Sequence, residues 1–225
     1  TPPSLVRLAQ LTPHLILGED WLSVESYPLM SQIAPTLLFT DEQADGTQAW
    51  QQDIEGIAKA LGRETEAKQL LAVFPQQVDT ARSELQPVLA AYPRVLLISS
   101  DLTSYTSIAP DSTVGRLLEQ IGFEVVRPGG VESDAEISLE VIPELENDII
   151  IVLSWDETML FNPEAEVKAK WDKNPLLKAL PAAEAGRVYF VDYQLWGSNI
   201  RGPLTDRLIL EALPELLLDS VRENP

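Results

Sequence analysis

Apolar residues follow one another along this chain in two patterns: short unbroken runs, and longer stripes that repeat every three or four positions. The unbroken runs cover residues 14–18, 35–39, 94–100, 123–126, 148–153 and 187–192. Runs of this length predict strands, and uniformly apolar strands are typical of a parallel sheet covered by helices on both faces. The pattern therefore predicts the α/β fold class.

Stripes with helical spacing fill the segments between these runs. They predict helices over residues 4–11, 47–61, 112–121, 138–145, 162–171, 174–180 and 203–218. Ser4 and Ser138 are of a type that caps helix starts, while Gly62 and Gly122 are of a type that ends helices. In the first helix, the residues expected to face inward are Leu5, Leu8, Ala9 and Leu11.

The longest stripe runs from Ala67 to Leu89 without a break. It predicts one helix over 64–91, about 28 residues and roughly 42 Å long. Such a length is typical of a spacer between two bodies, so we expect a first lobe over 1–63 and a second lobe over 92–225. Pro75 removes one backbone hydrogen bond and is expected to kink the helix. The alternative is two ordinary helices broken at Pro75.

Composition narrows the classes of function. The chain has 225 residues, of which 45% are hydrophobic, enough for a folded core. Its 16 basic and 35 acidic residues give a formal net charge of −19, which argues against nucleic acid and anionic lipid as partners. Cysteine is absent and His14 is the one histidine, so thiolate sites are excluded and histidine-based centres are hard to build. No apolar run approaches the ~18 residues that a membrane-spanning helix needs.

Ligands of parallel α/β sheets bind outside the carboxyl ends of the strands. In the second lobe three loops leave such ends, at residues 99–112, 154–166 and 193–203. Their aromatic and polar candidates for a ligand crevice are Tyr105, Trp155, Tyr193, Trp196, Asn199 and Arg201. The aromatic side chains are predicted to form the crevice wall and Arg201 its polar anchor. For Trp196 the alternative is a core position against the neighbouring helix.

Four segments resemble the periplasmic ferric-siderophore-binding proteins of ABC importers, a class with two α/β lobes joined by one long helix. The segments are PSLVRLAQLTPHLILG, LMSQIAPTLLF, SLEVIPELENDIIIVLSWD and NPLLKALPAAEAGRVYFVDYQLW. The fourth is the most specific, because GRVYFVD followed by a Trp-bearing loop is rarely met elsewhere. The chain departs from the family where Val6 and His14 replace the usual Glu and Asp; we expect His14 to be solvated. It also lacks the family's opening segment, so the resemblance implies an incomplete first lobe.

The resemblance implies a protein that captures a ferric siderophore between two lobes and delivers it to an ABC permease in the membrane. A monomer with no cofactor of its own is expected, in the periplasm or on the extracytoplasmic face, where a lipid anchor on the missing segment is one option. The family docks on its permease through one surface carboxylate per lobe. The candidates are Glu25 in the first lobe and Glu164 or Glu166 in the second; the alternative is that these are ordinary solvated residues.

Charge distinguishes between ligand classes, because ferric catecholates are strongly anionic and relatives that bind them usually present several Arg or Lys. The three loops offer Arg201 against the acidic residues Asp101, Asp111, Asp156 and Glu157. This balance favours a neutral or cationic ferric hydroxamate.

Several alternatives to a siderophore-binding protein stay open. One is a cobalamin- or haem-binding relative, although a single histidine disfavours axial haem ligation. A second is a fragment without binding activity. A third is a small α/β enzyme, although the chain has no GxGxxG, GxxxxGK[ST] or GxSxG motif.

Overall fold

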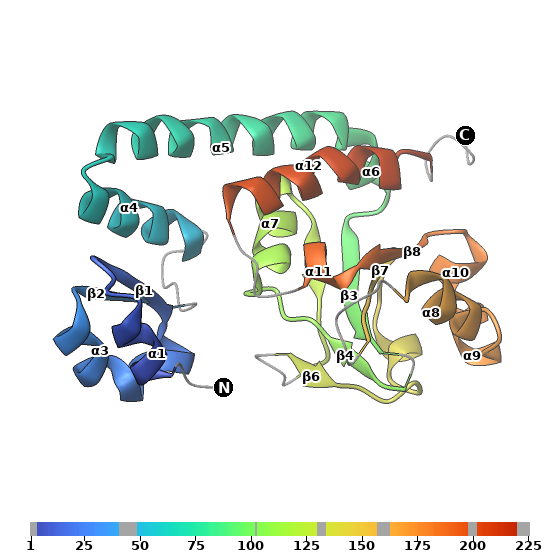
Figure 1. The fold of residues 1–225 in the computed structure, drawn as a ribbon. Helices are drawn as coiled ribbons and strands as arrows, with labels where there is room; N and C mark the ends of the chain where they lie inside the picture. The colour runs from blue at the N-terminus through green and yellow to red at the C-terminus, as the bar shows by residue number, and fades with distance from the viewer. Residues whose placement is uncertain are drawn as a thin grey trace. The chain divides into compact units, whose positions relative to one another are not determined.

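The computed structural model describes residues 4–40, 49–101, 103–129, 134–156, 163–197 and 202–219 (Figure 1). Backbone contacts divide the chain into two compact units, residues 1–68 (unit 1) and 69–225 (unit 2). Each unit has a sheet of its own and helices around it, so the predicted α/β class is confirmed. The lobe boundaries predicted after residues 63 and 91 stay a prediction.

Unit 1 combines two strands with short helices. Its elements are α1 (Leu5–Gln10), β1 (Ile16–Glu19), α2 (Asp20–Ser23), η1 (Val24–Ser26), α3 (Tyr27–Ile33), β2 (Thr36–Phe39) and α4 (Ala49–Leu61). Within the described residues, β1 and β2 pair in parallel as a two-stranded sheet. Two predicted helix boundaries are confirmed. Ser4 caps the start of α1, and Gly62 follows the end of α4 with a φ of 65°, a left-handed value that favours glycine.

One hydrophobic core cluster of unit 1 combines residues of β1 and α3. The residues that form it are Ile16, Met30 and Ala34, with Leu5, Leu8, Ile33 and Leu38 packed against them. The prediction that Ala9 and Leu11 face inward was wrong, because Ala9 is exposed and Leu11 is 73% exposed. α1 ends at Gln10 after six residues, so Leu11 lies past the helix. His14 is exposed, as expected.

The long stripe forms two helices, α5 (Glu64–Glu84) and α6 (Gln86–Ala91), instead of the single helix predicted over 64–91. The interruption falls at Leu85, not at Pro75, which lies inside the continuous α5. Pro87 explains why the interruption falls at Leu85. Proline has no amide hydrogen to donate to the carbonyl of Ser83, so α5 cannot continue through it, but proline is tolerated in the first turn of a new helix. α5 nevertheless carries the chain across the boundary between the two units.

The sheet of unit 2 is parallel in its centre and antiparallel at one edge. Its strands are β3 (Arg94–Ser100), β4 (Tyr105–Ser107), β5 (Glu124–Val126), β6 (Ala135–Glu136), β7 (Ile149–Ser154) and β8 (Val188–Asp192). The described strands follow the order β6-β4-β3-β7-β8, and β5 also pairs with β3. β3, β5, β7 and β8 are parallel, as predicted, whereas β4 and β6 add antiparallel pairs that the sequence pattern did not predict.

Helices cover both faces of this sheet (Figure 1). They are α7 (Thr113–Ile121), α8 (Glu164–Trp171), α9 (Pro175–Lys178), α10 (Pro181–Glu184), α11 (Tyr193–Trp196) and α12 (Pro203–Leu217). Successive strand residues point to opposite faces, and Ile150 and Val152 of β7 pack with Trp171 of α8 in one core cluster. Ile151 and Leu153 on the other face are equally buried. Burial on both faces explains why these strands are apolar at every position.

The prediction of a helix over residues 138–145 was wrong. The structure has a turn there, followed by the short 3-10 helix η2 (Ile142–Glu144). Pro143 accounts for the difference, because proline has no backbone N–H and would break the second turn of a helix that starts at Ser138. The neighbouring prediction at α7 is confirmed, since the helix begins after Ser112 and ends at Gly122.

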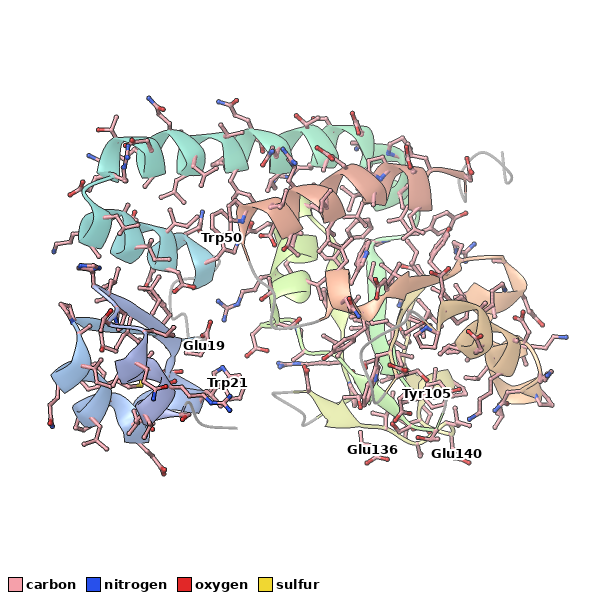
Figure 2. All side chains as sticks on the ribbon, viewed as in Figure 1. Glu19, Trp21, Trp50, Tyr105, Glu136 and Glu140 are labelled. Atoms are coloured by element: carbon pink, nitrogen blue, oxygen red, sulfur yellow. The ribbon has the colours of Figure 1, made fainter. Side chains whose placement is uncertain are left out.

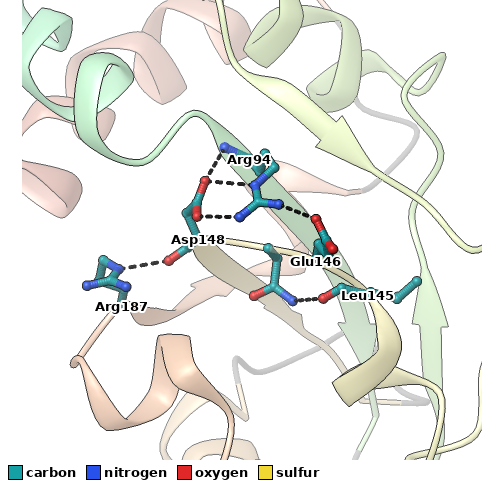
Figure 3. Close-up of polar contacts among 6 residues, drawn as sticks. Arg94, Leu145, Glu146, Asp148 and Arg187 are labelled. Carbon is teal, nitrogen blue, oxygen red and sulfur yellow. Dashed lines mark hydrogen bonds and ion pairs between the residues drawn. The ribbon is translucent and has the colours of Figure 1, made fainter.

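An ion-pair cluster closes the amino end of the unit 2 sheet (Figure 3). Asp148, just before β7, accepts hydrogen bonds from the backbone N–H, Nε and Nη2 of Arg94 at 3.0, 3.2 and 3.0 Å. Arg94 Nη1 also reaches the exposed Glu146 at 2.7 Å. Arg187 donates from Nε to the carbonyl of Asp148 at 2.8 Å, and its guanidinium stacks over Tyr92. The cluster ties β3, β7 and the start of β8 together.

Candidate functional site at the carboxyl edge of the unit 2 sheet

Three strands of unit 2 end at one level. Ser100 of β3 pairs in register with Ser154 of β7, and Ser154 pairs with Asp192 of β8. The Trp155 N–H donates to the carbonyl of Ser100 at 3.1 Å, which fixes the start of the loop after β7. The segments that follow β3, β7 and β8 therefore leave the sheet side by side, with β8 leading directly into α11, and we call this row the carboxyl edge of unit 2.

Two of the predicted aromatic residues meet at this edge. The rings of Trp155 and Tyr193 have centroids 6.0 Å apart and planes tilted by 41°, and both side chains are half-buried. Burial raises the pKa of Tyr193, and the negative charge of Asp134 raises it further. A tilted ring pair with part of its surface exposed offers apolar contact area to a ligand.

Tyr105 has a more buried position. It is 9% exposed, belongs to the core cluster on the α8 face, and meets Trp171 edge-on with centroids 6.1 Å apart. Burial raises the pKa of Tyr105, and the hydrogen bond that links its hydroxyl to Ser100 partly opposes that rise. The structure places Tyr105 at the carboxyl end of β3 but within the core, and its contact with a ligand stays a prediction.

Trp196 is also buried, with 5% of its side chain exposed. It ends the short helix α11, which contacts α12, β7 and β8. This core position matches the alternative considered for Trp196, and its place in a ligand wall stays a prediction. Asn199, Arg201 and Glu157 lie outside the described residues.

The loop after β3 is organised by Asp101. Its Oδ1 accepts hydrogen bonds from the backbone and hydroxyl groups of Thr103 and Ser104, at 2.7 to 3.0 Å. Burial alone would raise the pKa of Asp101, but these four hydrogen bonds outweigh it and hold the value at about 2. The carboxyl edge therefore carries a fixed negative charge at neutral pH.

The proposed docking glutamates lie on helical turns. Glu25 is exposed in η1, one turn before α3. Glu164 and Glu166 both belong to the first turn of α8, where Glu164 is half-buried and Glu166 is exposed. An exposed carboxylate is available to a partner, but exposure does not distinguish these residues from other surface glutamates.

Three residues near strand ends were missed by the sequence reasoning. Trp21 is 60% exposed and follows the carboxyl end of β1, where Glu19 also lies (Figure 2). The strand-end rule that singled out the loops of the second lobe would have found Trp21 in unit 1 as well. Asp134 had no such signal. It lies just before β6, in the unpredicted β4–β6 pairing; it accepts a hydrogen bond from the Ala109 N–H at 2.7 Å, and its charge raises the pKa of Tyr193.

The ranges that the structure describes, residues 4–40, 49–101, 103–129, 134–156, 163–197 and 202–219, also bear on metal sites and on membrane spans. Within these ranges, no three His, Cys, Asp or Glu side chains are grouped so as to hold a metal ion. None of the helices in the same ranges combines the length and apolar character needed to cross a bilayer.

Comparison with known proteins identifies the family. Residues 3–195 match the periplasmic binding protein family. The chain belongs to this family. The match covers both units, from α1 to the carboxyl edge of unit 2 at α11. The resemblance recognised in the sequence is therefore confirmed at the level of the family.

The relatives of this periplasmic binding protein include two from Bacillus subtilis. The putative ABC transporter substrate-binding lipoprotein YhfQ is 29% identical over 86% of this chain and 61% of its own length. The Fe(3+)-citrate-binding protein YfmC is 27% identical over 89% of this chain and 60% of its own length. The chain thus spans about three fifths of these relatives.

Among solved structures, Staphylococcus aureus SirA complexed with staphyloferrin B superposes with a TM-score of 0.77. The match has 22% sequence identity and covers 96% of this chain and 75% of SirA. At that identity the likeness establishes the fold, which agrees with the two-unit α/β architecture described above.

Proposed function

We propose that this protein is the substrate-binding component of an ABC importer and that its ligand is a ferric chelate. The observation that carries the proposal is membership of the periplasmic binding protein family across residues 3–195. Relatives of similar sequence are named for ABC transport and for binding ferric citrate. The relatives' names also support a location on the extracytoplasmic face of the membrane, with lipid anchoring as in YhfQ.

The carboxyl edge of unit 2 is the proposed ligand surface. Trp155 and Tyr193 present a half-buried ring pair where three loops leave the sheet, and apolar arms of a chelate pack well on such rings. Arg201 and Asn199 are proposed to supply hydrogen-bond donors to chelate oxygens.

Charge supports a ferric hydroxamate as the ligand. The pKa of Asp101 is about 2, so its carboxylate is ionised at neutral pH. Asp134 adds a second carboxylate near Tyr193. The whole chain carries a formal charge of −19. A neutral or cationic chelate avoids the repulsion that a strongly anionic ferric catecholate would meet at this edge.

A fluorescence titration tests this function. The chain is titrated with a ferric trihydroxamate, a ferric tricatecholate and ferric citrate, each with its iron-free form as control, and ligand quenching of tryptophan emission is recorded. We expect the ferric trihydroxamate to bind most tightly. Tightest binding of the catecholate or citrate would overturn the hydroxamate assignment alone, whereas binding of no ferric chelate would overturn the proposed function.

We also propose that Glu25 and a glutamate of the first turn of α8, Glu164 or Glu166, dock on the permease. Glu25→Lys combined with Glu164→Lys in the full-length protein is expected to lower chelate uptake into cells while ligand affinity stays unchanged. The matched control reverses two exposed glutamates elsewhere, Glu55 in α4 and Glu119 in α7. Equal uptake by both double variants would remove Glu25 and Glu164 from docking.

A further inference from the structure

Gly197 has a close contact that backbone geometry does not explain. It follows α11, and its N–H donates to the carbonyl of Tyr193 at 2.8 Å. Its φ of −133° is open to any residue, so glycine is not required by conformation. A Cβ added at this position would nevertheless lie 2.6 Å from Cε2 and 2.7 Å from Cδ2 of Tyr193, and 2.7 Å from Cδ2 of Leu153. Space, not torsion, therefore excludes a side chain at residue 197.

The two neighbours of Gly197 differ in their freedom to move. Leu153 is fully buried in β7 and is held between Ser99 and Val191 in the ladder. Tyr193 is half-buried, and its ring is the one tilted against Trp155 at 6.0 Å. A Cβ at residue 197 would thus displace the Tyr193 ring more readily than it would displace the sheet.

We infer that Gly197 is a positioning residue that sets the Tyr193 ring against Trp155 and so shapes the aromatic surface for the apolar arms of a ferric chelate. The inference rests on the proposed function for the identity of the ligand. The position of the ring itself does not depend on that function. Gly197 acts through Tyr193, because its own backbone has no side chain to offer a ligand.

The test compares Gly197→Ala with Gly129→Ala. Gly129 is a matched control, because it is exposed, an added Cβ there meets no atom within 4 Å, and its φ lies outside the left-handed region. Near-ultraviolet circular dichroism reports the ring pair, and titration with a ferric trihydroxamate reports affinity. We expect Gly197→Ala to change the aromatic spectrum and to weaken binding about 2- to 12-fold, the value of one aromatic contact. Gly129→Ala should leave both unchanged.

A double variant isolates the route through Tyr193. In a Tyr193→Ala background the ring is gone and the contact of the new Cβ with Leu153 Cδ2 remains, so adding Gly197→Ala should weaken binding no further. If Gly197→Ala lowers the melting temperature through the clash, Tyr193→Ala should restore part of that loss. Equal weakening by Gly197→Ala with and without the Tyr193 ring would overturn the inference.

The two proposals fail in different ways. A wild-type chain that binds no ferric chelate, but whose aromatic spectrum changes in Gly197→Ala and not in Gly129→Ala, would refute the function and keep the positioning role. A chain that binds the chelate equally well with Gly197→Ala, with an unchanged aromatic spectrum, would keep the function and refute the positioning role.

Discussion

Asp53 and Asp101 are the same side chain in two environments, and their pKa values move in opposite directions. Asp53 lies in α4 of unit 1, where burial and then the charge of Glu19 raise its pKa to about 6. Asp101 is also disfavoured by burial, but its hydrogen bonds to Thr103 and Ser104 bring its pKa to about 2. At Asp101 the hydrogen bonds to the carboxylate outweigh burial, because they favour the charged form.

The raised pKa of Asp53 predicts a stabilising substitution. A folded-state pKa above the ordinary 3.8 means that Asp53 favours folding below pH 3.8, and that this contribution is lost as the pH rises through 6. Asp53→Asn removes the charge and should raise the free energy of unfolding at pH 7.5 by about 1 kcal/mol, after allowance for solvent screening of a half-exposed group. Urea unfolding at pH 7.5 and pH 4 checks this. A loss of stability, or a gain that is equal at both pH values, would contradict it.

At the scale of elements, the two ends of the unit 2 sheet have different tasks. The amino end holds the ion-pair cluster of Arg94, Asp148 and Arg187, which joins neighbouring strands (Figure 3). The carboxyl end holds the half-buried pair of Trp155 and Tyr193. Substitutions at the amino end are therefore expected to change stability, and substitutions at the carboxyl end to change ligand binding.

Asp148→Ala tests the amino end. The change leaves the partly buried backbone N–H of Arg94 without its acceptor, which should cost about 1–3 kcal/mol of unfolding free energy at pH 7. Burial opposes ionisation, but the bonds from Arg94 lower the pKa of Asp148, so this stability is present above pH 3.8 and is lost as the pH falls below it. Chemical unfolding at pH 7 and pH 3 measures both effects.

Glu146→Ala is the matched control for Asp148→Ala. It removes a partner of the same Arg94 side chain, but Glu146 is 87% exposed. Its loss should leave the unfolding free energy nearly unchanged, because exposed ion pairs add little. Equal effects of the two substitutions, or a weaker chelate affinity in Asp148→Ala, would contradict the separation of tasks between the two ends.

Local signals account for what the sequence predicted well. Gly62 and Gly122 end helices because their positive φ values, 65° and 120°, suit glycine, and the signal lies in the residue itself. Long-range pairing accounts for what was missed. The Asp101 turn folds residues 105–107 back on β3 as β4, and the β4–β6 pairing brings Asp134 to the Ala109 N–H. For Trp196 the sequence left a ligand wall and a core position both open, because a Trp after a strand gives the same pattern whether it faces solvent or a helix.

At the scale of the whole molecule, two properties bear on the proposed ligand: the family fold and the acidic composition of the chain. The chain belongs to the periplasmic binding protein family and carries a net charge of −19. The family match supports the proposed class of function, and the charge favours neutral or cationic chelates as the proposed ligand. We propose that the carboxyl edge of unit 2 binds such a ferric chelate through Trp155 and Tyr193.

Calorimetric titration of a ferric trihydroxamate into the wild-type chain and into the double variant Trp155→Ala, Tyr193→Ala tests that claim most directly. We expect saturable binding to the wild type. In the double variant the affinity should fall by at least about tenfold, because two ring contacts are lost. Both rings are partly buried, so the double variant should melt at a lower temperature, and both titrations are run below that temperature. Absence of binding to the wild type, or equal affinity of the two proteins, would contradict the claim.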